Sequence, residues 1–279
     1  MSFLTTLAVT FVVAVRWPRL ANLFGQTRLP LHRFFAVFAV TSFVSFILPK
    51  DWGDVGGRLV WSKQRADHSY AAAGTALFWD KVMDATVLFP ILPACLVYFS
   101  LWTGLDRKPS GGNCLLGGAA IFWFASARAV QVMPYTLNWG LGLASKLPFL
   151  RNRVRPVDLP SLDRTACVKL FGMTCLKPVI LAVQYLGFAY APGLHFSVTT
   201  IFFATPVSQL AFVFSFTAGG LGVLEAGWFA ALSLAGVSNP DIGLFLLGQR
   251  VYSIACMGVL AAATLLCSLA WKALKEGHR

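Results

Sequence analysis

The stretch that decides the fold is residues 242–271, IGLFLLGQRVYSIACMGVLAAATLLCSLAW, in which Arg250 is the single charged side chain. A helix of about 20 apolar residues is long enough to cross the hydrocarbon core of a bilayer. The whole chain shares this character, because its 279 residues are 57% hydrophobic and 12% charged. An average soluble domain has about 45–50% apolar and about 25% charged residues. We therefore predict an all-α polytopic membrane protein.

Seven further apolar runs predict the other helices, at residues 3–15, 34–48, 70–102, 114–137, 166–190, 196–216 and 220–236. The run at 34–48 is short for a crossing, and the run at 70–102 is too long for one. We expect about six to eight membrane helices, some broken or re-entrant, in a single domain over residues 1–279. The first run has no basic residues before it and no cleavage site, which favours a retained helix over a signal peptide.

Lysine and arginine gather in three segments that are expected to face the cytoplasm. These are residues 16–33 (Arg16, Arg19, Arg28, Arg33), residues 134–165 (Lys146, Arg151, Arg153, Arg155, Arg164) and the C-terminal tail (Lys272, Lys275, Arg279). Simple alternation of crossings would put the second segment outside. The conflict disappears if residues 34–61 dip into the membrane and return to the same side. The N-terminus is then outside, which suggests that a further helix precedes this chain.

The net charge of +12 is explained by these loops, so no nucleic-acid partner is expected. Three further cations, Arg128, Lys169 and Lys177, interrupt apolar runs and are expected to reach a membrane interface, and Lys177 before Pro178 suggests another helix break. The six cysteines form no CxxC pair and the four histidines are scattered, so neither a metal nor a cofactor is expected.

The chain divides into two halves with matching features, at about residues 1–135 and 160–279. Each half has a helix, a break rich in proline and glycine, and a later helix with a polar cluster. In the first half the break at 49–58 precedes Asp80, Lys81 and Asp84. In the second half Pro206 and the stretch 219–225 precede Gln249 and Arg250. This order predicts an inverted repeat with a central site between its halves.

These motifs also carry a family resemblance. They are Arg16-Trp17, Pro49 with Gly53, Asp54 and Arg58, then Asp80, Lys81 and Asp84, then GGLGVLE at 219–225, and finally Arg250. Their order resembles the transmembrane flippase region of lysylphosphatidylglycerol synthases and of stand-alone membrane proteins that share it. The family commonly has arginine at Leu224 and Lys81, has proline or leucine at Ala218, and has one residue fewer between Asp54 and Arg58. The resemblance implies lipid translocation or an accessory role, and no enzyme activity, because the aminoacyl-transferase domain is missing.

The charged residues inside the spans are the candidate site, because a charge at the bilayer centre costs about 2.5–3.5 kcal/mol and needs a partner or a cavity. In one interpretation Arg58, Lys81 and Arg250 hold a phosphate. The carboxylates Asp54, Asp80, Asp84 and Glu225 then hold an amine or balance the arginines. In the other, the charges pair structurally, Glu225 with Arg250 and Asp80 with Arg58. Gly219 and Gly220 either present backbone N–H groups to an anion or allow tight helix packing.

The expected function is a flippase-like translocase that moves a lipid with a polar or anionic head group across the bacterial plasma membrane. The alternative is a non-transporting accessory protein for a lipid- or glycan-modifying enzyme. A membrane-embedded transferase with an aspartate as base is a third class, and the chain lacks a donor-binding motif for it. The expected partners are the membrane lipid and, in the alternative, that enzyme. A homo-oligomer is left open.

Overall fold

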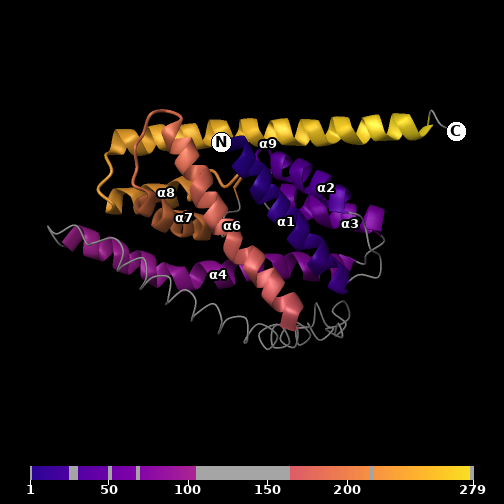
Figure 1. Cartoon of the computed structure of the whole chain (residues 1–279), viewed down its shortest axis with the longest axis horizontal. Coiled ribbons are helices and arrows are strands. Elements are labelled where there is room, and N and C mark those ends of the chain that lie inside the picture. The colour runs from indigo at the N-terminus through magenta and orange to yellow at the C-terminus, as the bar shows by residue number, and fades with distance from the viewer. Residues whose placement is uncertain are drawn as a thin grey trace.

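The computed structural model describes residues 2–24, 31–49, 52–66, 70–104, 164–213 and 217–276. This part of the chain is helical, as predicted (Figure 1). In the first half lie α1 (Ser2–Phe24), α2 (Leu31–Val44), the π-helical turn η1 (Trp52–Gly56), α3 (Gly57–Ala66) and α4 (Tyr70–Gly104). In the second half lie α6 (Arg164–Tyr190), α7 (Val198–Val213), α8 (Val223–Leu234) and α9 (Asn239–Glu276).

Three of the described helices contain segments long and apolar enough to cross a bilayer, namely Ser2–Ala21, Lys169–Tyr190 and Asn239–Ala270. Shorter apolar helices cover Leu31–Val44, Val198–Phe212 and Val223–Leu234. The segment in α9 has only 17% of its residues buried in the protein. Figure 1 shows why, since α9 runs along one edge of the bundle and extends well beyond it. Apolar side chains on such a surface are suited to contact with lipid.

Several predicted boundaries are wrong for local reasons. Helix α1 was predicted to end at residue 15, but it continues through Arg16 and Trp17 to Phe24. Apolar residues before and after Arg16 keep one face of this helix buried. Pro178 and Pro206 lie inside α6 and α7, and neither ends its helix. The second break therefore lies after α7, in the glycine-rich residues 217–222. The expected helix at 114–137, the side chain of Arg128 and most of the basic segment at 134–165 lie outside the described residues.

The short second helix folds back on itself as an antiparallel hairpin. Phe34 of α2 packs against Trp61 of α3, with ring centroids 5.3 Å apart. Nearer the tip, a Cβ on Gly53 would lie 2.6 Å from the Cα of Ser45. Glycine is therefore the residue that lets the two arms meet at this tip. The chain at 34–61 returns along itself, as the short apolar run and the polar stretch after it predict.

Helices α7 and α8 form a second antiparallel hairpin. A Cβ on Gly227 of α8 would lie 2.9 Å from the Cα of Ser208 in α7. The tip is turned by residues 217–222, where Gly219, Gly220 and Gly222 all adopt positive φ angles of 54°, 72° and 83°. Residues with a Cβ rarely adopt this conformation, which is why the glycines stand at this turn.

The two hairpins meet at their tips. Pro49 and Ala218 form an isolated antiparallel β-bridge. Beside it, the backbone N–H of Gly219 donates to the carbonyl oxygen of Ser45 at 2.7 Å. A broken segment from each half thus reaches the middle of the protein, and each satisfies a backbone group of the other.

Corresponding helices of the two halves make corresponding contacts. Helix α4 packs against α7 of the second hairpin, and α9 packs against α2 of the first. In the same way α1 contacts α2 and α4, while α6 contacts α7 and α9. Helices α1 and α6 pack against each other at the centre. This pattern is typical of transporters built from two repeats around a central site.

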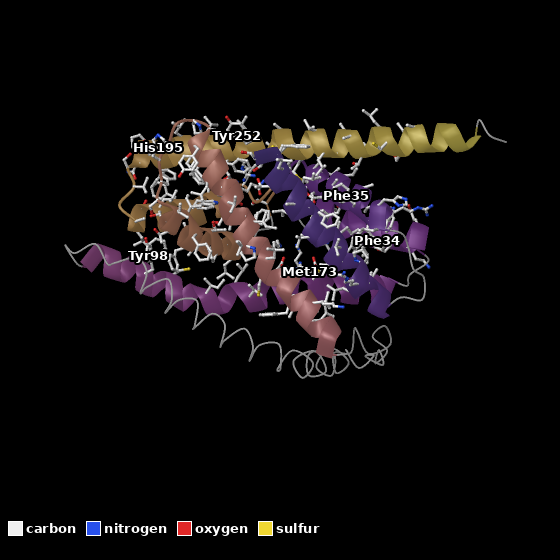
Figure 2. All side chains as sticks on the ribbon, viewed as in Figure 1. Phe34, Phe35, Tyr98, Met173, His195 and Tyr252 are labelled. Atoms are coloured by element: carbon white, nitrogen blue, oxygen red, sulfur yellow. The ribbon has the colours of Figure 1, made fainter. Side chains whose placement is uncertain are left out.

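Two apolar clusters flank that centre. One lies among α4, α6, α7, α8 and α9 and includes Tyr98, Phe188 and Trp228. The other lies among α1, α2, α4 and the first turns of α6, and it includes Trp17 and Phe34. Figure 2 shows Tyr98 and Phe34 on opposite sides of α6. The polar residues discussed next lie between these two clusters.

Candidate functional site

A cavity of 230 Å³ lies where the two halves meet, and every described helix contributes to its walls. At about 30 Å³ of liquid volume per water, it has room for several waters or a small polar group. Its polar lining falls into two sets. The charged set includes Asp54, Arg58, Asp80, Lys81, Asp84 and Lys177, and the uncharged set includes Thr6, Thr10, Gln184, Gln209 and Gln249.

Seven charged side chains form one continuous chain of ion pairs, which we call the charged cluster. In the order in which each pairs with the next, they are Lys81, Asp54, Arg58, Asp80, Arg16, Asp84 and Lys177. The six successive N–O distances are 3.3, 2.6, 3.5, 2.6, 2.6 and 2.5 Å. Cations and anions alternate, so each carboxylate lies between two positive groups. Four cations and three carboxylates leave a net charge of +1 when all are ionised.

The solvent exposure of the side chains increases toward both ends of the charged cluster. The two arginine side chains in its interior are 1% exposed, whereas the lysines at its ends are 29% and 22% exposed. Both lysines line the cavity. An ammonium group has three donors, and each of these lysines makes one hydrogen bond within the described part of the protein. The arginines therefore hold the cluster together, and the lysines present spare donors to the cavity.

Arg16 is the residue that sequence reasoning placed wrongly. It was expected in a cytoplasmic loop, but it lies within α1 and is fully buried. Its guanidinium reaches Asp80 and Asp84, both at 2.6 Å, and donates to Thr174 at 3.2 Å. The spacing of Asp80 and Asp84, one helical turn apart, suits two arms of one arginine. The Arg16-Trp17 motif was the available signal, and its neighbour Arg19 is exposed, as a loop cation would be.

Lys177 is also corrected by the structure. It was expected to reach a membrane interface, but its ammonium pairs with Asp84 at 2.5 Å inside the bundle. The reason is the length of its side chain, which spans from α6 to α4. Lys169, two turns earlier on α6, is exposed. Lys177 therefore joins the site residues that the sequence motifs named.

The second half repeats the arrangement in a smaller form. Glu225, at the start of α8, pairs with Arg250 of α9 at 2.6 Å. In the first half Asp54, in the second arm of its hairpin, pairs with Lys81 of α4 at 3.3 Å. In each half a hairpin carboxylate meets a cation on the long helix that follows. The structural pairings considered from the sequence, Glu225 with Arg250 and Asp80 with Arg58, are both present.

Gly219 and Gly220 are buried at the hairpin tip, but the helix start beside them is not open to a ligand. The carboxylate of Glu225 accepts a hydrogen bond from the N–H of Gly222 at 2.8 Å. Arg250 also donates to the carbonyl oxygen of Gly219 at 2.7 Å. An anion at the start of α8 would compete with the protein's own carboxylate. The glycines therefore shape the tip, and Arg250 fixes it.

Helices α1 and α6 set the spacing of the polar groups. They are antiparallel, because Arg16 contacts Thr174 at one end and Gln184 donates to Thr6 at 2.6 Å at the other. Ten residues separate the two contacts on each helix, which corresponds to about 15 Å. The charged cluster and the Gln184–Thr6 pair therefore occupy different depths of one cavity.

Other kinds of site are not evident in the part of the chain that the structure describes. No group of three or more His, Cys, Asp or Glu side chains in it has the arrangement of a metal site. Four of the six cysteines, Cys95, Cys175, Cys256 and Cys267, have described side chains, and all four are free thiols.

A family model described as the lysylphosphatidylglycerol synthase TM region matches residues 1–270. The chain belongs to this family. The resemblance inferred from the motifs is thus confirmed, and membership in the lysylphosphatidylglycerol synthase TM family associates the protein with a lipid-related role in a membrane. No curated protein and no solved structure matches the chain.

Proposed function

We propose that this member of the lysylphosphatidylglycerol synthase TM family translocates a lipid with an anionic head group across a bacterial plasma membrane. The head group occupies the cavity between the halves while the acyl chains stay in the bilayer. The observation that carries the proposal is the charged cluster, which ends in a cavity-facing lysine on both sides. We further propose that the protein acts as a transporter and not as an enzyme.

The charge balance of the cluster supports an anionic ligand. Each of its three carboxylates lies between two cations, so the local charge disfavours an amine as a further partner. The net charge of +1 and the spare donors of Lys81 and Lys177 suit a phosphodiester. A hydrogen bond between ionised groups is stronger than one between neutral groups. Because the cluster ends in a lysine on both sides, a bound anion continues its alternation of cations and anions.

The paired hairpins suggest how the cavity changes its exposure. Their tips are joined by the Pro49–Ala218 bridge and by the hydrogen bond from Gly219 to Ser45. If one half rocks against the other, these short contacts are the ones that break and reform. In this mechanism the pairs of Arg16 and Arg58 stay intact and hold the first half together. The Glu225–Arg250 pair joins α8 to α9 in the second half. The basic loops and the C-terminus are cytoplasmic in this proposal.

The alternative role, an accessory protein without transport, gives the charged cluster a purely structural purpose. It draws support from the completeness of the ion pairing around Arg16. In that role the expected partner is a lipid- or glycan-modifying enzyme. The size of the cavity and the partial exposure of the two lysines favour the translocase, because a structural cluster gains nothing from either.

A transport assay on the purified chain tests the proposal. The protein is reconstituted into liposomes with trace fluorescent lipids, and dithionite destroys the fluorescence of those in the outer leaflet. We expect the protected fraction to fall below one half for an anionic phosphatidylglycerol probe and less so for zwitterionic phosphatidylcholine. Protection equal to that in protein-free liposomes for both probes would reject the translocase and favour the accessory role.

A further inference from the structure

A second hollow lies on the outer side of α2, and its lining is mostly apolar. Its volume is 970 Å³, and its walls come from α2, η1, α3 and α9. Trp52, Val60 and Leu265 in these walls are 77%, 45% and 50% exposed. We call this hollow the outer groove. Open apolar surfaces of this kind mark sites that contact a membrane or a partner.

Helix α2 separates the outer groove from the central cavity. Phe38 and Ser42 line the cavity, whereas Val37 and Val40 line the groove. Because successive residues of a helix are about 100° apart, these two sets lie on opposite faces of α2. One helix thus has a polar hollow on one face and an apolar hollow on the other.

The seam between α2 and α9 lies beside both hollows. Helix α9 packs along α2 (Figure 1) and contributes Met257 to the cavity and Leu265 to the groove. At the seam a Cβ on Gly258 of α9 would lie 3.2 Å from the ring of Phe43 in α2. The half-buried ring of Phe43 therefore packs against a glycine, which has no side chain to hold it in place.

The corresponding seam of the other half, between α4 and α7, is packed more firmly. Tyr98 of α4 stacks on Phe203 of α7 with ring centroids 4.3 Å apart, and the two residues are 4% and 3% exposed. Stacked aromatic rings in a buried cluster attract each other beyond the apolar area that they bury. We therefore expect the cavity to open to the bilayer at the α2–α9 seam more readily than at the α4–α7 seam.

The length of the outer groove matches one acyl chain. One wall runs from Trp52 to Gln64, and these 12 residues correspond to about 18 Å of helix. The hydrocarbon of one leaflet is about 15 Å thick, half of the whole core. An acyl chain fills one leaflet, so it fits the groove from end to end. A crossing helix from a second protein would be about twice as long as the groove.

We propose that the outer groove holds one acyl chain of the translocated lipid while the head group lies in the central cavity. This inference rests on the proposed function. The chain cannot follow the head group inward, because hydrocarbon in the cavity would strip water from its charged and amide groups. It reaches the groove across the α2–α9 seam and remains open to the bilayer there. The two linked sites raise each other's effective concentration of ligand.

Photolabelling within the bilayer tests this placement. The probe is phosphatidylglycerol with a diazirine in the middle of one acyl chain, at a fixed trace fraction in liposomes that contain the purified full chain. The matrix is dioleoyl phosphatidylcholine, alone or mixed equally with dioleoyl phosphatidylglycerol, and labelled residues are mapped by mass spectrometry. We expect label on Val37, Val40 and Val60 that drops at least about fivefold in the mixed matrix, because phosphatidylglycerol competes by mass action.

The outward face of α9 is the internal reference. Leu244 and Leu247 are exposed and belong to the lining of neither hollow, so ordinary bilayer lipid should label them equally in both matrices. Groove label that is equally insensitive to the matrix would overturn the inference, because a chain tethered by its head group must be displaced by a lipid with that head group. Absence of groove label would also overturn it and would indicate that protein, such as a second copy, covers the groove.

Filling the groove tests its part in transport. Val40→Trp adds a large ring on the groove face of α2, away from the cavity. Phosphatidylglycerol transport in the dithionite assay should fall at least about tenfold, because linked binding is lost when one part has no room. The matched control is Val198→Trp, at an exposed valine of α7 outside both linings, which should transport at the wild-type rate.

A second variant covers a failure of the first to fold. Val60→Trp fills the same groove from α3 and carries the same expectation. Wild-type transport by a folded variant with the groove filled overturns the inference and leaves the proposed function standing. Wild-type protein that transports neither probe lipid would instead overturn the proposed function.

Discussion

The backbone N–H of Gly219 donates to the carbonyl oxygen of Ser45 at 2.7 Å and so joins two hairpins that are far apart in the sequence. Arg250 binds the same glycine, since its guanidinium donates to the carbonyl oxygen of Gly219 at 2.7 Å. The tip of the second hairpin is thus held from α9 on one side and by the first hairpin on the other. The cavity lies beside this junction, with Ser45, Gly219 and Arg250 in its wall.

A disulfide across the junction should stop the protein from changing its exposure. Pro49 and Ala218 are paired in an antiparallel bridge, so their Cα atoms lie about 4.5–5.5 Å apart, within the range for a disulfide. We expect Pro49→Cys with Ala218→Cys, in a chain without its native cysteines, to lose lipid transport on oxidation and to regain it on reduction. The measurement is the dithionite assay before and after reductant.

The two single-cysteine variants serve as the control for the disulfide, since oxidation should leave their rates unchanged. Full transport by the oxidised double variant, with the crosslink verified by mass spectrometry, would show that the tips need not separate.

Removal of Arg16 should destabilise the fold strongly. Arg16→Met leaves Asp80 and Asp84 buried without their shared partner, and loss of one member of a buried ion pair costs about 3–5 kcal/mol. The melting temperature in detergent should therefore drop sharply. The matched control is Arg19→Met, three residues later on α1, where the side chain is exposed. Equal melting temperatures for the two variants would mean that the charged cluster does not hold α1 to α4.

The close contact inside the second hairpin predicts a selective effect of a single methyl group. A Cβ on Gly227 would lie 2.9 Å from the Cα of Ser208, so Gly227→Ala must push α7 and α8 apart. Overpacking of this kind costs about 1–3 kcal/mol. Gly243→Ala in α9 meets nothing within 4 Å and should be neutral or slightly stabilising. Thermal unfolding of both variants checks the prediction, which fails if Gly227→Ala is as stable as the wild type.

Much of this fold could be predicted from hydropathy and from the positions of charges. The first hairpin followed from one short apolar run and from the need to keep basic segments on one side. Asp54, Arg58, Asp80, Lys81, Asp84, Glu225 and Arg250 followed from the cost of charges in apolar surroundings, and the structure brings all of them to the central cavity or its rim. Their roles in binding remain predictions.

The partners of these charges could not be predicted, because they come from distant parts of the chain. Arg16 is separated from Asp80 by 64 residues, and Lys177 from Asp84 by 93. A lone cation at the end of an apolar run looks the same in sequence whether it faces water or a buried carboxylate. Gln184 and Gln209 were not named as site residues for a related reason, since an uncharged polar residue in a span gives a weak signal. Gln184 lies seven residues after Lys177, and this helical spacing was the available clue.

The most direct measurement is lipid transport by the variant Lys81→Gln with Lys177→Gln. Both side chains end the charged cluster at the cavity, and glutamine keeps a polar group of similar length without the charge. We expect transport of an anionic lipid to fall at least about tenfold, because two charge-assisted contacts are lost. The control is Lys63→Gln with Lys169→Gln, which changes two exposed lysines on α3 and α6. If the Lys81 and Lys177 variant is folded and transports anionic lipid at the wild-type rate, these lysines do not hold the head group and the central claim is wrong.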